Sequence, residues 1–403
     1  MNGTTDGTTM EHVAFDAGGA GAGVQASRFR ARGGAEELHL SVVGPAGATF
    51  ERGLAAVEAA YREALGRLDL PPSSAVFRRV FVSDAANQAA AVRGSSLGGG
   101  GEGAGPVAVS VVEQPPLPER KLALWAYHVH DPAGLRKDAV PGGVALRRGG
   151  LGHLWVTDLG HAGTNGDANP LAQTRRIFAT YEDLLAAQGA DLARHAIRTW
   201  LFVQNVDVNY AGMVKGRIEV FDRSGLTADT HYIASTGIEG RHADPARLVN
   251  LDAYAIPGVG AGQVRYLQAP DHLGPTHLYG VTFERGVAVD HGDRRHVLVS
   301  GTASIEPGGR TLHPGDVGRQ VERTFANVEA LLADAGAGPA DLAHLIVYLR
   351  DPADRGVVEA FVRARYPRVP WILVRAPVCR PDWLVEAECV AIRGVRNPGL
   401  AAF

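Results

Sequence analysis

Apolar residues recur at helical spacing in three separate stretches of the chain, and each stretch leads into an apolar run. The stretches are 49–87, 175–207 and 322–354. The clearest apolar stripe begins just before the third stretch and continues in it, at Val321, Phe325, Val328, Leu331 and Leu332. A short turn containing Gly, Asp or Pro follows each stripe, and the next apolar run predicts a strand. A pattern that occurs three times predicts a repeat architecture.

The pattern around each stretch predicts a larger unit. In the third unit we expect strands over 296–305, 342–350, 371–375 and 383–392, and helices over 317–335, with Asp316 at its N-cap, and 357–365. In the second unit we expect strands over 153–160, 197–206, near 232–235 and over 249–256, and helices over 175–188 and 210–224. In the first unit we expect a helix over 54–67 and strands over 38–43, 107–112 and 122–129, with the Gly-rich insert 98–105 replacing the second helix.

These units are predicted to span 28–135, 150–257 and 268–396, after a Gly- and Thr-rich tail, 1–27, that we expect to be disordered. Each unit would carry helices on one face of its sheet and leave the other face apolar. Burying those faces requires the three units to pack sheet against sheet around a common axis. The predicted fold is therefore α+β, with three imperfect repeats forming a monomeric pseudo-trimer.

Composition excludes several classes of protein. The chain has 403 residues, of which 45% are hydrophobic, enough for substantial cores. Its net charge of -3 argues against a nucleic-acid partner. The two cysteines do not make a disulfide framework, and no run of about 18 apolar residues predicts a membrane span. The N-terminus lacks the basic start and apolar core of a signal peptide, so we expect a cytoplasmic protein.

The repeats serve as an internal control for functional residues. Glu386 lies on the last predicted strand of the third unit, where the first unit has Ala123 and the second has Asn250. A structural role common to all units would not need an acid in one alone. Glu388 shares the face of Glu386 because side chains alternate along a strand. The competing interpretation is a surface carboxylate on a half-exposed strand.

Several sequence segments carry a family resemblance. GPTHLYG, LVSGTASI and VEAECVAIR resemble the RidA (YjgF) family, whose members are homotrimers of chorismate-mutase-like units with sites between subunits. From about residue 28 to 394, the chain resembles a narrower group, the FkbO-type chorismatases, most strongly in RTWLFVQNVDVNY, HYIASTGIEGR and YLQAPDHLGPTHLYGVTFERG. Such proteins are monomers that imitate a trimer and cleave chorismate into pyruvate and a cyclic carboxylic acid.

The resemblance implies roles for two residues of the third unit. It makes Glu386 the general acid that protonates the terminal enol carbon of chorismate. Such an acid must stay protonated at neutral pH, which burial or a second carboxylate achieves by raising its pKa. Cys379, seven residues earlier, resembles the cysteine of the chorismatases that form 3-hydroxybenzoate, where it would assist rearrangement of an epoxide-like intermediate. The alternative for Cys379 is a small buried apolar residue, and Cys389 is assigned to the core.

Chorismate has two carboxylates, so the site should offer bidentate arginines. We expect Arg198 and Arg265 to bind them, the alternative being ordinary surface arginines. The remaining binding candidates are Tyr210, Tyr266, Tyr279 and Thr276, which could equally be core residues, and Gly301 and Ala303 in the SGTA segment. Trp371 falls near the ligand-binding arginine of RidA proteins, which argues against imine deaminase activity. No phosphate loop, dinucleotide fingerprint or metal-ligand spacing is found, so we expect no metal and no cofactor.

The sequence thus predicts a chorismatase that forms 3-hydroxybenzoate and pyruvate for a secondary-metabolite or antibiotic pathway. Two other products remain open, a dihydroxycyclohexadiene carboxylate formed by hydrolysis and 4-hydroxybenzoate. An alternative of another class is a non-catalytic RidA-like protein that binds a metabolite.

Overall fold

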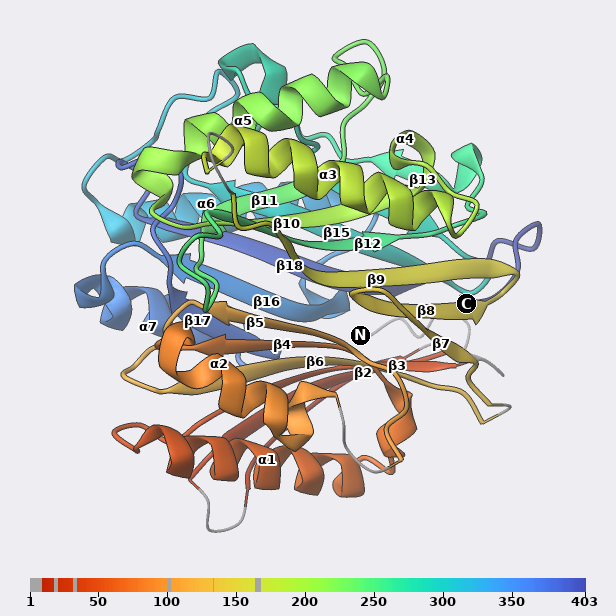
Figure 1. Cartoon of the computed structure of the whole chain (residues 1–403), viewed down its shortest axis with the longest axis vertical. Coiled ribbons are helices and arrows are strands. Elements are labelled where there is room, and N and C mark those ends of the chain that lie inside the picture. The colour runs from red at the N-terminus through yellow and green to blue at the C-terminus, as the bar shows by residue number, and fades with distance from the viewer. Residues whose placement is uncertain (1–8, 18–20, 32–34, 100–102, 133, 164–167) are drawn as a thin grey trace.

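The computed structural model describes residues 9–17, 21–31, 35–99, 103–132, 134–163 and 168–403. Within these residues the strands form three six-stranded sheets (Figure 1). The spatial orders are β1-β2-β3-β6-β4-β5, β11-β10-β12-β9-β8-β7 and β13-β14-β15-β18-β16-β17. The second order is written from the opposite edge of its sheet; when it is reversed, all three sheets have the same strand order. The three-repeat α+β fold predicted from the sequence is confirmed.

Unit 1 carries its helices after its third and fourth strands. Its strands are β1 (Thr9–Asp16), β2 (Gly23–Arg30), β3 (Glu36–Val43), β4 (Ala75–Val82), β5 (Ala108–Glu113) and β6 (Leu122–His130), and its helices are α1 (Phe50–Arg67) and α2 (Ala85–Gly94). The expected helix over 54–67 begins four residues earlier, because Thr49 caps it by accepting a hydrogen bond from the Arg52 N–H.

Unit 2 repeats this arrangement. Its strands are β7 (Lys137–Val140), β8 (Gly143–Arg148), β9 (Leu151–Gly160), β10 (Ala196–Val203), β11 (Ala234–Glu239) and β12 (Val249–Ala255), and its helices are α3 (Pro170–Ala186), α4 (Leu192–His195) and α5 (Val206–Arg223). The strand expected near 232–235 lies slightly later, as β11, paired in parallel with β10.

Unit 3 matches its predicted elements most closely. Its strands are β13 (Val264–Tyr266), β14 (Gly286–Asp290), β15 (Arg294–Ala303), β16 (Leu342–Leu349), β17 (Trp371–Arg375) and β18 (Val385–Gly394), and its helices are α6 (Val317–Asp334) and α7 (Arg355–Arg365). Asp316 caps α6 as expected, accepting from the Arg319 N–H at 3.0 Å.

Three expectations about the ends of the units and about the Gly-rich insert were wrong. The tail 1–27 is not disordered from 9 on where the structure describes it, because β1 pairs with β2 along its length and β2 extends the sheet of unit 1. The Gly-rich insert 98–105, described at 98–99 and 103–105, does not replace the second helix, since α2 precedes it with Asp84 as its N-cap. The sheets also begin earlier than the predicted boundaries at 28, 150 and 268. Alanine-rich α2 has no marked apolar stripe, and short edge strands leave little periodic signal.

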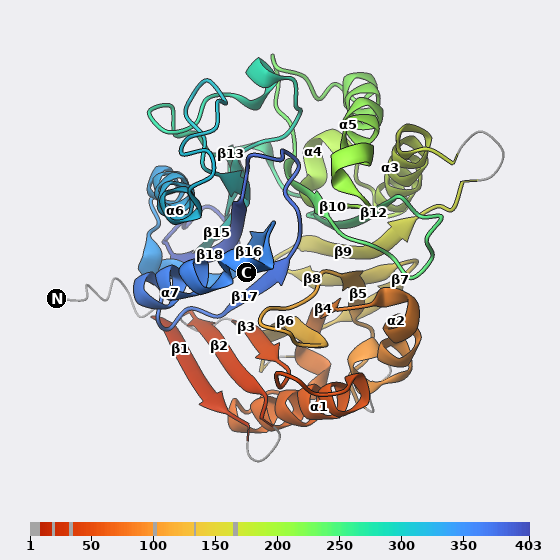
Figure 2. The ribbon, with the colours of Figure 1, turned by 90° about the vertical axis from the view of Figure 1, so that its left-hand side faces the viewer.

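The three sheets face one another and the helices lie outside them (Figure 2). The inner faces share one core, in which aromatic residues from units 1 and 2 meet apolar residues of unit 3. Within the described residues, no helix is long and apolar enough to cross a membrane.

Each boundary between units contains a buried pair of an arginine and a carboxylate. The pairs are Arg79–Asp252 between units 1 and 2, Arg198–Glu388 between units 2 and 3, and Arg294–Glu37 between units 3 and 1, with N···O distances of 2.8, 2.7 and 2.6 Å. Buried pairs add little net stability, but removing one partner leaves an unpaired buried charge. They therefore favour one relative arrangement of the units.

Candidate active site

A cleft lies between units 2 and 3. Unit 2 contributes residues of α5 and β11, and unit 3 contributes β15, β18, and the segments that precede β14 and follow β17. Six of the residues predicted from the sequence line it, namely Tyr210, Tyr279, Gly301, Ala303, Cys379 and Glu386. The cleft therefore brings both candidate catalytic residues together.

The strand register fixes the position of Glu386 in the sheet. The three equivalent cross-strand pairs are Tyr348 with Glu386, Phe81 with Ala123, and Phe202 with Asn250. Glu386 thus stands where unit 1 has Ala123 and unit 2 has Asn250, as the sequence alignment predicted. By the same comparison, Arg198 occupies the position in unit 2 that Phe77 occupies in unit 1.

The Glu386 carboxyl is buried, with 3% of its surface exposed, and it faces the cleft. A Cβ atom at Gly301 would lie 2.3 Å from Glu386 Oε1, so a larger residue there would displace the Glu386 carboxyl. Burial and then the charge of Glu388 raise the pKa of Glu386 to about 8, against the opposing effects of Arg198 and Arg285. Glu386 therefore carries a proton at neutral pH and can donate it into the cleft.

Cys379 also faces the cleft, next to the Tyr210 hydroxyl. Burial, followed by the nearby Glu386 carboxyl, raises the pKa of the Cys379 thiol to about 12. The sulfur is therefore a neutral thiol rather than a nucleophilic thiolate, and it can take part in hydrogen bonding or packing.

Arg217 is a cleft residue that the sequence reasoning missed. It is 1% exposed, and its Nε donates to Thr282 Oγ1 at 3.3 Å. Among the described residues, its Nη2 has no hydrogen-bond partner although it is buried. Such an unsatisfied charged donor is costly unless a ligand completes it. Arg217 was detectable, since it occupies the buried face of α5 at helical spacing between Met213 and Phe221.

Two further arginines of unit 3 line the cleft and were also missed. Arg285 donates to the Gly274 carbonyl at 2.9 and 3.2 Å, and Arg380 donates to the Gly309 carbonyl at 2.9 Å. Their guanidinium groups lie 5.3 and 5.0 Å from the centre of the Tyr279 ring. The cleft thus combines three cations with one neutral acid, an arrangement suited to a substrate with more than one carboxylate.

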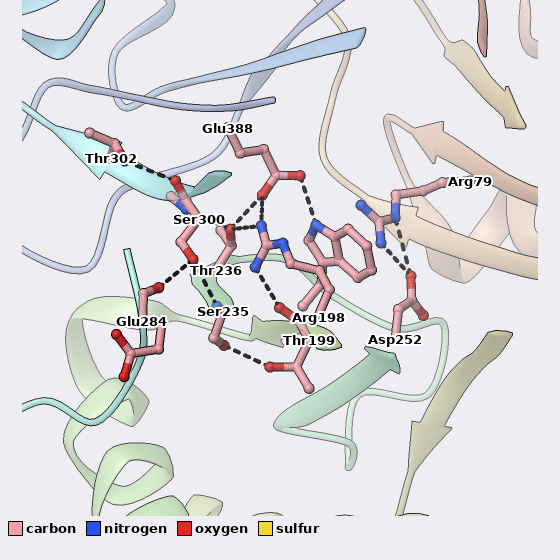
Figure 3. Close-up of polar contacts among 12 residues, drawn as sticks. Arg79, Arg198, Thr199, Ser235, Thr236, Asp252, Glu284, Ser300, Thr302 and Glu388 are labelled. Carbon is pink, nitrogen blue, oxygen red and sulfur yellow. Dashed lines mark hydrogen bonds and ion pairs between the residues drawn. The ribbon is translucent and has the colours of Figure 1, made fainter. Parts of the chain in front are cut away.

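The predicted role of Arg198 as a carboxylate-binding residue is not supported by its position. Its guanidinium is 1% exposed and does not line the cleft. It donates to Glu388 Oε2 at 2.7 Å, to the Thr199 carbonyl at 2.8 Å and to the Thr236 hydroxyl (Figure 3). Its donors are therefore used within the interface between units.

Arg265, Tyr266 and Thr276 also lie outside the cleft. Arg265 is half-exposed and binds Asp334, and the Tyr266 ring stacks on His231 with a centroid distance of 4.4 Å. The Thr276 hydroxyl donates to the Phe283 carbonyl at 2.6 Å, so it holds the loop next to the cleft. The sequence placed these residues near the third unit, but it did not show whether their side chains point into the cleft.

The equivalent space between units 1 and 2 lacks the features of this site. In β9, Asp158 occupies the bulge position that Gly301 occupies in β15. Its carboxylate binds Arg93 at 2.6 Å and lies 3.4 Å from Arg247. The ion-paired side chain of Asp158 therefore occupies the position at which the cleft between units 2 and 3 has only a glycine. Among the described residues, no three His, Cys, Asp or Glu side chains are grouped to hold a metal ion.

Similar proteins are known for the third unit and for the fold of the whole chain. The family model described as Endoribonuclease L-PSP matches residues 285–393. A RutC family protein of Pyrococcus abyssi is 30% identical over 102 residues, which are 24% of this chain and 78% of that protein. The crystal structure of a protein named chorismatase is similar with a TM-score of 0.60 and 21% identity, covering 79% of this chain and 93% of that one. At that identity the likeness shows a common fold.

Proposed function

We propose that this chain, which belongs to the RutC family through its third unit, converts chorismate to 3-hydroxybenzoate and pyruvate. The observation that carries the proposal is the protonated Glu386 carboxyl, buried in a cleft with three arginines. The likeness of the whole fold to a chorismatase supports the choice of substrate. We take the chain to be a cytoplasmic enzyme that needs no metal or cofactor.

The proposed reaction begins with proton transfer from Glu386 to the terminal carbon of the enolpyruvyl group. This makes the adjacent carbon an oxocarbenium-like centre and weakens the bond between the ring and the ether oxygen. The neighbouring ring hydroxyl oxygen then bonds to the ring carbon as pyruvate leaves, and its proton returns to the Glu386 carboxylate. The epoxide-like intermediate opens at the carbon that carried the hydroxyl, the other ring carbon loses its proton and the oxygen gains one, which makes the ring aromatic. The two products together have the composition of chorismate, so no water is consumed.

The three arginines account for substrate orientation in this proposal. Arg217 offers an unused donor to one carboxylate, and Arg285 and Arg380 offer positive charge to the other from the opposite wall. The Tyr279 ring between the latter two restricts where their guanidinium groups can move. Binding two carboxylates fixes the enol carbon relative to Glu386, which lowers the entropic cost of proton transfer.

The test is to identify the products after purified protein is incubated with chorismate. We expect 3-hydroxybenzoate and pyruvate in equal amounts by chromatography. In ¹⁸O-water the aromatic product should remain unlabelled, whereas label in the ring product would indicate hydrolysis. If no pyruvate is released, the protein is not a chorismatase and the binding-protein alternative gains support.

The rate should depend on pH through Glu386. A general acid works while it is protonated, and its pKa is raised to about 8. We therefore expect kcat/KM to be nearly constant from pH 6 to 7 and to fall about tenfold per pH unit well above 8. Pyruvate release measured across this range checks the prediction. A rate that rises through pH 8 would instead indicate a general base.

Cys379→Ala is expected to alter the fate of the intermediate more than its formation. The neutral thiol lies beside Tyr210 and Glu386, so its loss changes the packing next to the proposed ring position. Pyruvate release should remain within roughly tenfold of the unmodified protein, because the general acid is retained. Chromatography should show a new ratio of aromatic to non-aromatic products. Cys379→Ser, which keeps a small polar group, should restore part of the original ratio. An unchanged product profile would assign Cys379 to packing.

A further inference from the structure

Two buried carboxylates on β18 face different spaces. Glu386 and Glu388 are two residues apart, so they project from the same face of the strand, about 7 Å apart along it. Glu386 lines the catalytic cleft, whereas Glu388 lines a separate small pocket with Arg198 and Trp200. Glu388 is 4% exposed and is not among the residues of the cleft. It therefore cannot act by touching substrate.

Side chains of unit 2 bind both oxygens of Glu388. Arg198 Nη2 donates to Oε2 at 2.7 Å and Trp200 Nε1 donates to Oε1 at 2.7 Å. The Thr236 hydroxyl also donates to Oε2 (Figure 3). Charge-assisted hydrogen bonds of this kind favour the ionised carboxylate. Unit 2 thus holds a negative charge next to the proton donor of unit 3.

Thr236 connects this carboxylate to the wall of the cleft. Besides donating to Glu388, its Oγ1 accepts from the Gly301 N–H at 2.9 Å and from Arg198 Nη2 at 2.5 Å. Gly301 is the residue against which Glu386 packs. The hydroxyl has one proton and two lone pairs, so all of its hydrogen-bonding capacity is used. The position of the Glu388 carboxylate is therefore fixed by a fully bonded network.

The groups around Glu386 differ in the sign of their effect. Burial opposes its ionised form most strongly; among the charged groups, Glu388 also opposes it, whereas Arg198 and Arg285 favour it. The other titratable neighbours are Tyr210 on α5, Tyr348 on β16 and Cys379 after β17, which are neutral near pH 7 because burial raises their pKa values. Among the described residues that act on Glu386, Glu388 alone supplies negative charge to offset the two arginines.

We propose that Glu388, held by Arg198, Trp200 and Thr236 of unit 2, is a positioning residue whose charge keeps Glu386 protonated as the general acid. The proposal rests on the proposed function, and it gives Arg198 a role other than substrate binding. It also explains why the site lies at this boundary, because the acid comes from one unit and the groups that hold its charged neighbour come from another.

The test compares pH profiles of kcat/KM for the unmodified protein and Glu388→Gln. Removing a charge about 7 Å away at an effective dielectric constant of ~20 should move the falling limb to lower pH by roughly 1–2 units. At pH 8 we expect the variant to be about 5–50-fold slower, and at pH 6 within about threefold. A falling limb that stays within about 0.3 units of the original overturns the proposal.

Asp252→Asn is the matched control. Asp252 stands at the position equivalent to Glu388 and binds Arg79 at the boundary of units 1 and 2. Both substitutions leave a buried arginine unpaired, so both should lower thermal stability. If Glu388 had only a structural role, kcat/KM would fall at the same pH in both variants. The proposal predicts that this pH shifts in Glu388→Gln alone. Glu388→Asp retains the charge and should restore the limb to within about half a unit.

A readout without turnover separates this proposal from the proposed function. Infrared difference spectra of the free protein detect protonated carboxyl groups, and Glu386→Gln identifies the band that belongs to Glu386. We expect this band to titrate at lower pH in Glu388→Gln than in the unmodified protein, whether or not chorismate is a substrate. An unchanged titration rejects the role of Glu388 even if chorismate is consumed, and a shift supports it even if chorismate is not.

Discussion

Glu386→Gln is expected to lower kcat for pyruvate release from chorismate by about 10²–10⁴-fold, the usual contribution of a general acid. Glutamine has nearly the same shape and occupies the space beside Gly301, but its amide cannot deliver a proton to carbon. Binding of substrate should change little because the three arginines remain. Coupled measurement of pyruvate gives kcat and KM separately, and the loss should appear in kcat.

The same variant should be at least as stable as the unmodified protein. The pKa of Glu386 is raised in the folded state to about 8, so the stability it contributes is present below its ordinary pKa and is lost as pH rises towards 8. Glutamine has no such pH dependence. We therefore expect Glu386→Gln to melt at the same or a higher temperature at pH 8. Glu306→Gln, at an exposed carboxylate paired with Arg310, is the control and should keep full activity.

Activity of Glu386→Gln within a few-fold of the unmodified protein would remove Glu386 from the mechanism. Loss of activity together with loss of the cooperative melting transition would assign Glu386 a structural role. Both results conflict with a buried carboxyl that faces open space and, among the described residues, accepts no hydrogen bond from a side chain.

Arg217→Met is expected to raise KM for chorismate by about 10–100-fold, because a charge-assisted hydrogen bond contributes roughly 1.5–3 kcal/mol. Methionine preserves much of the apolar stem of Arg217 within α5 and removes its donors. The fold should tolerate the change, since Nη2 has no partner among the described residues. Steady-state kinetics and a direct binding measurement with chorismate on the inactive Glu386→Gln background would measure the loss.

Two arginines provide matched controls for Arg217. Arg223 lies on the same helix and pairs with Glu182 on the surface, and Arg265 pairs with Asp334 away from the cleft. Arg223→Met and Arg265→Met should leave KM within about twofold, since exposed ion pairs contribute little. Equal effects of Arg217→Met and Arg265→Met would contradict the placement of the substrate in this cleft.

Much of the fold could be predicted because its signals are local. Apolar periodicity, caps such as Asp316 and turn residues act within a few positions, and the threefold repetition amplifies them. The identity of Glu386 as the distinctive acid was also accessible, since one repeat differs from the others at that position. The prediction missed the strands at one edge of each sheet, β1 and β2, β7 and β8, and β13 and β14, and it missed helix α2, which lacks a contrasting apolar face.

The sequence by itself determined the three units, their packing around a common axis and the residue that breaks the repeat. The tertiary structure decided which arginines face the cleft and what Arg198 does. Arg198 and Glu388 are 190 positions apart, and their contact depends on the register of two strands in different units. A shift of one residue in either strand would turn a side chain to the opposite face, and no local pattern encodes that choice. Periodicity along the chain therefore defines the elements, whereas the packing of distant strands defines the chemistry of the site.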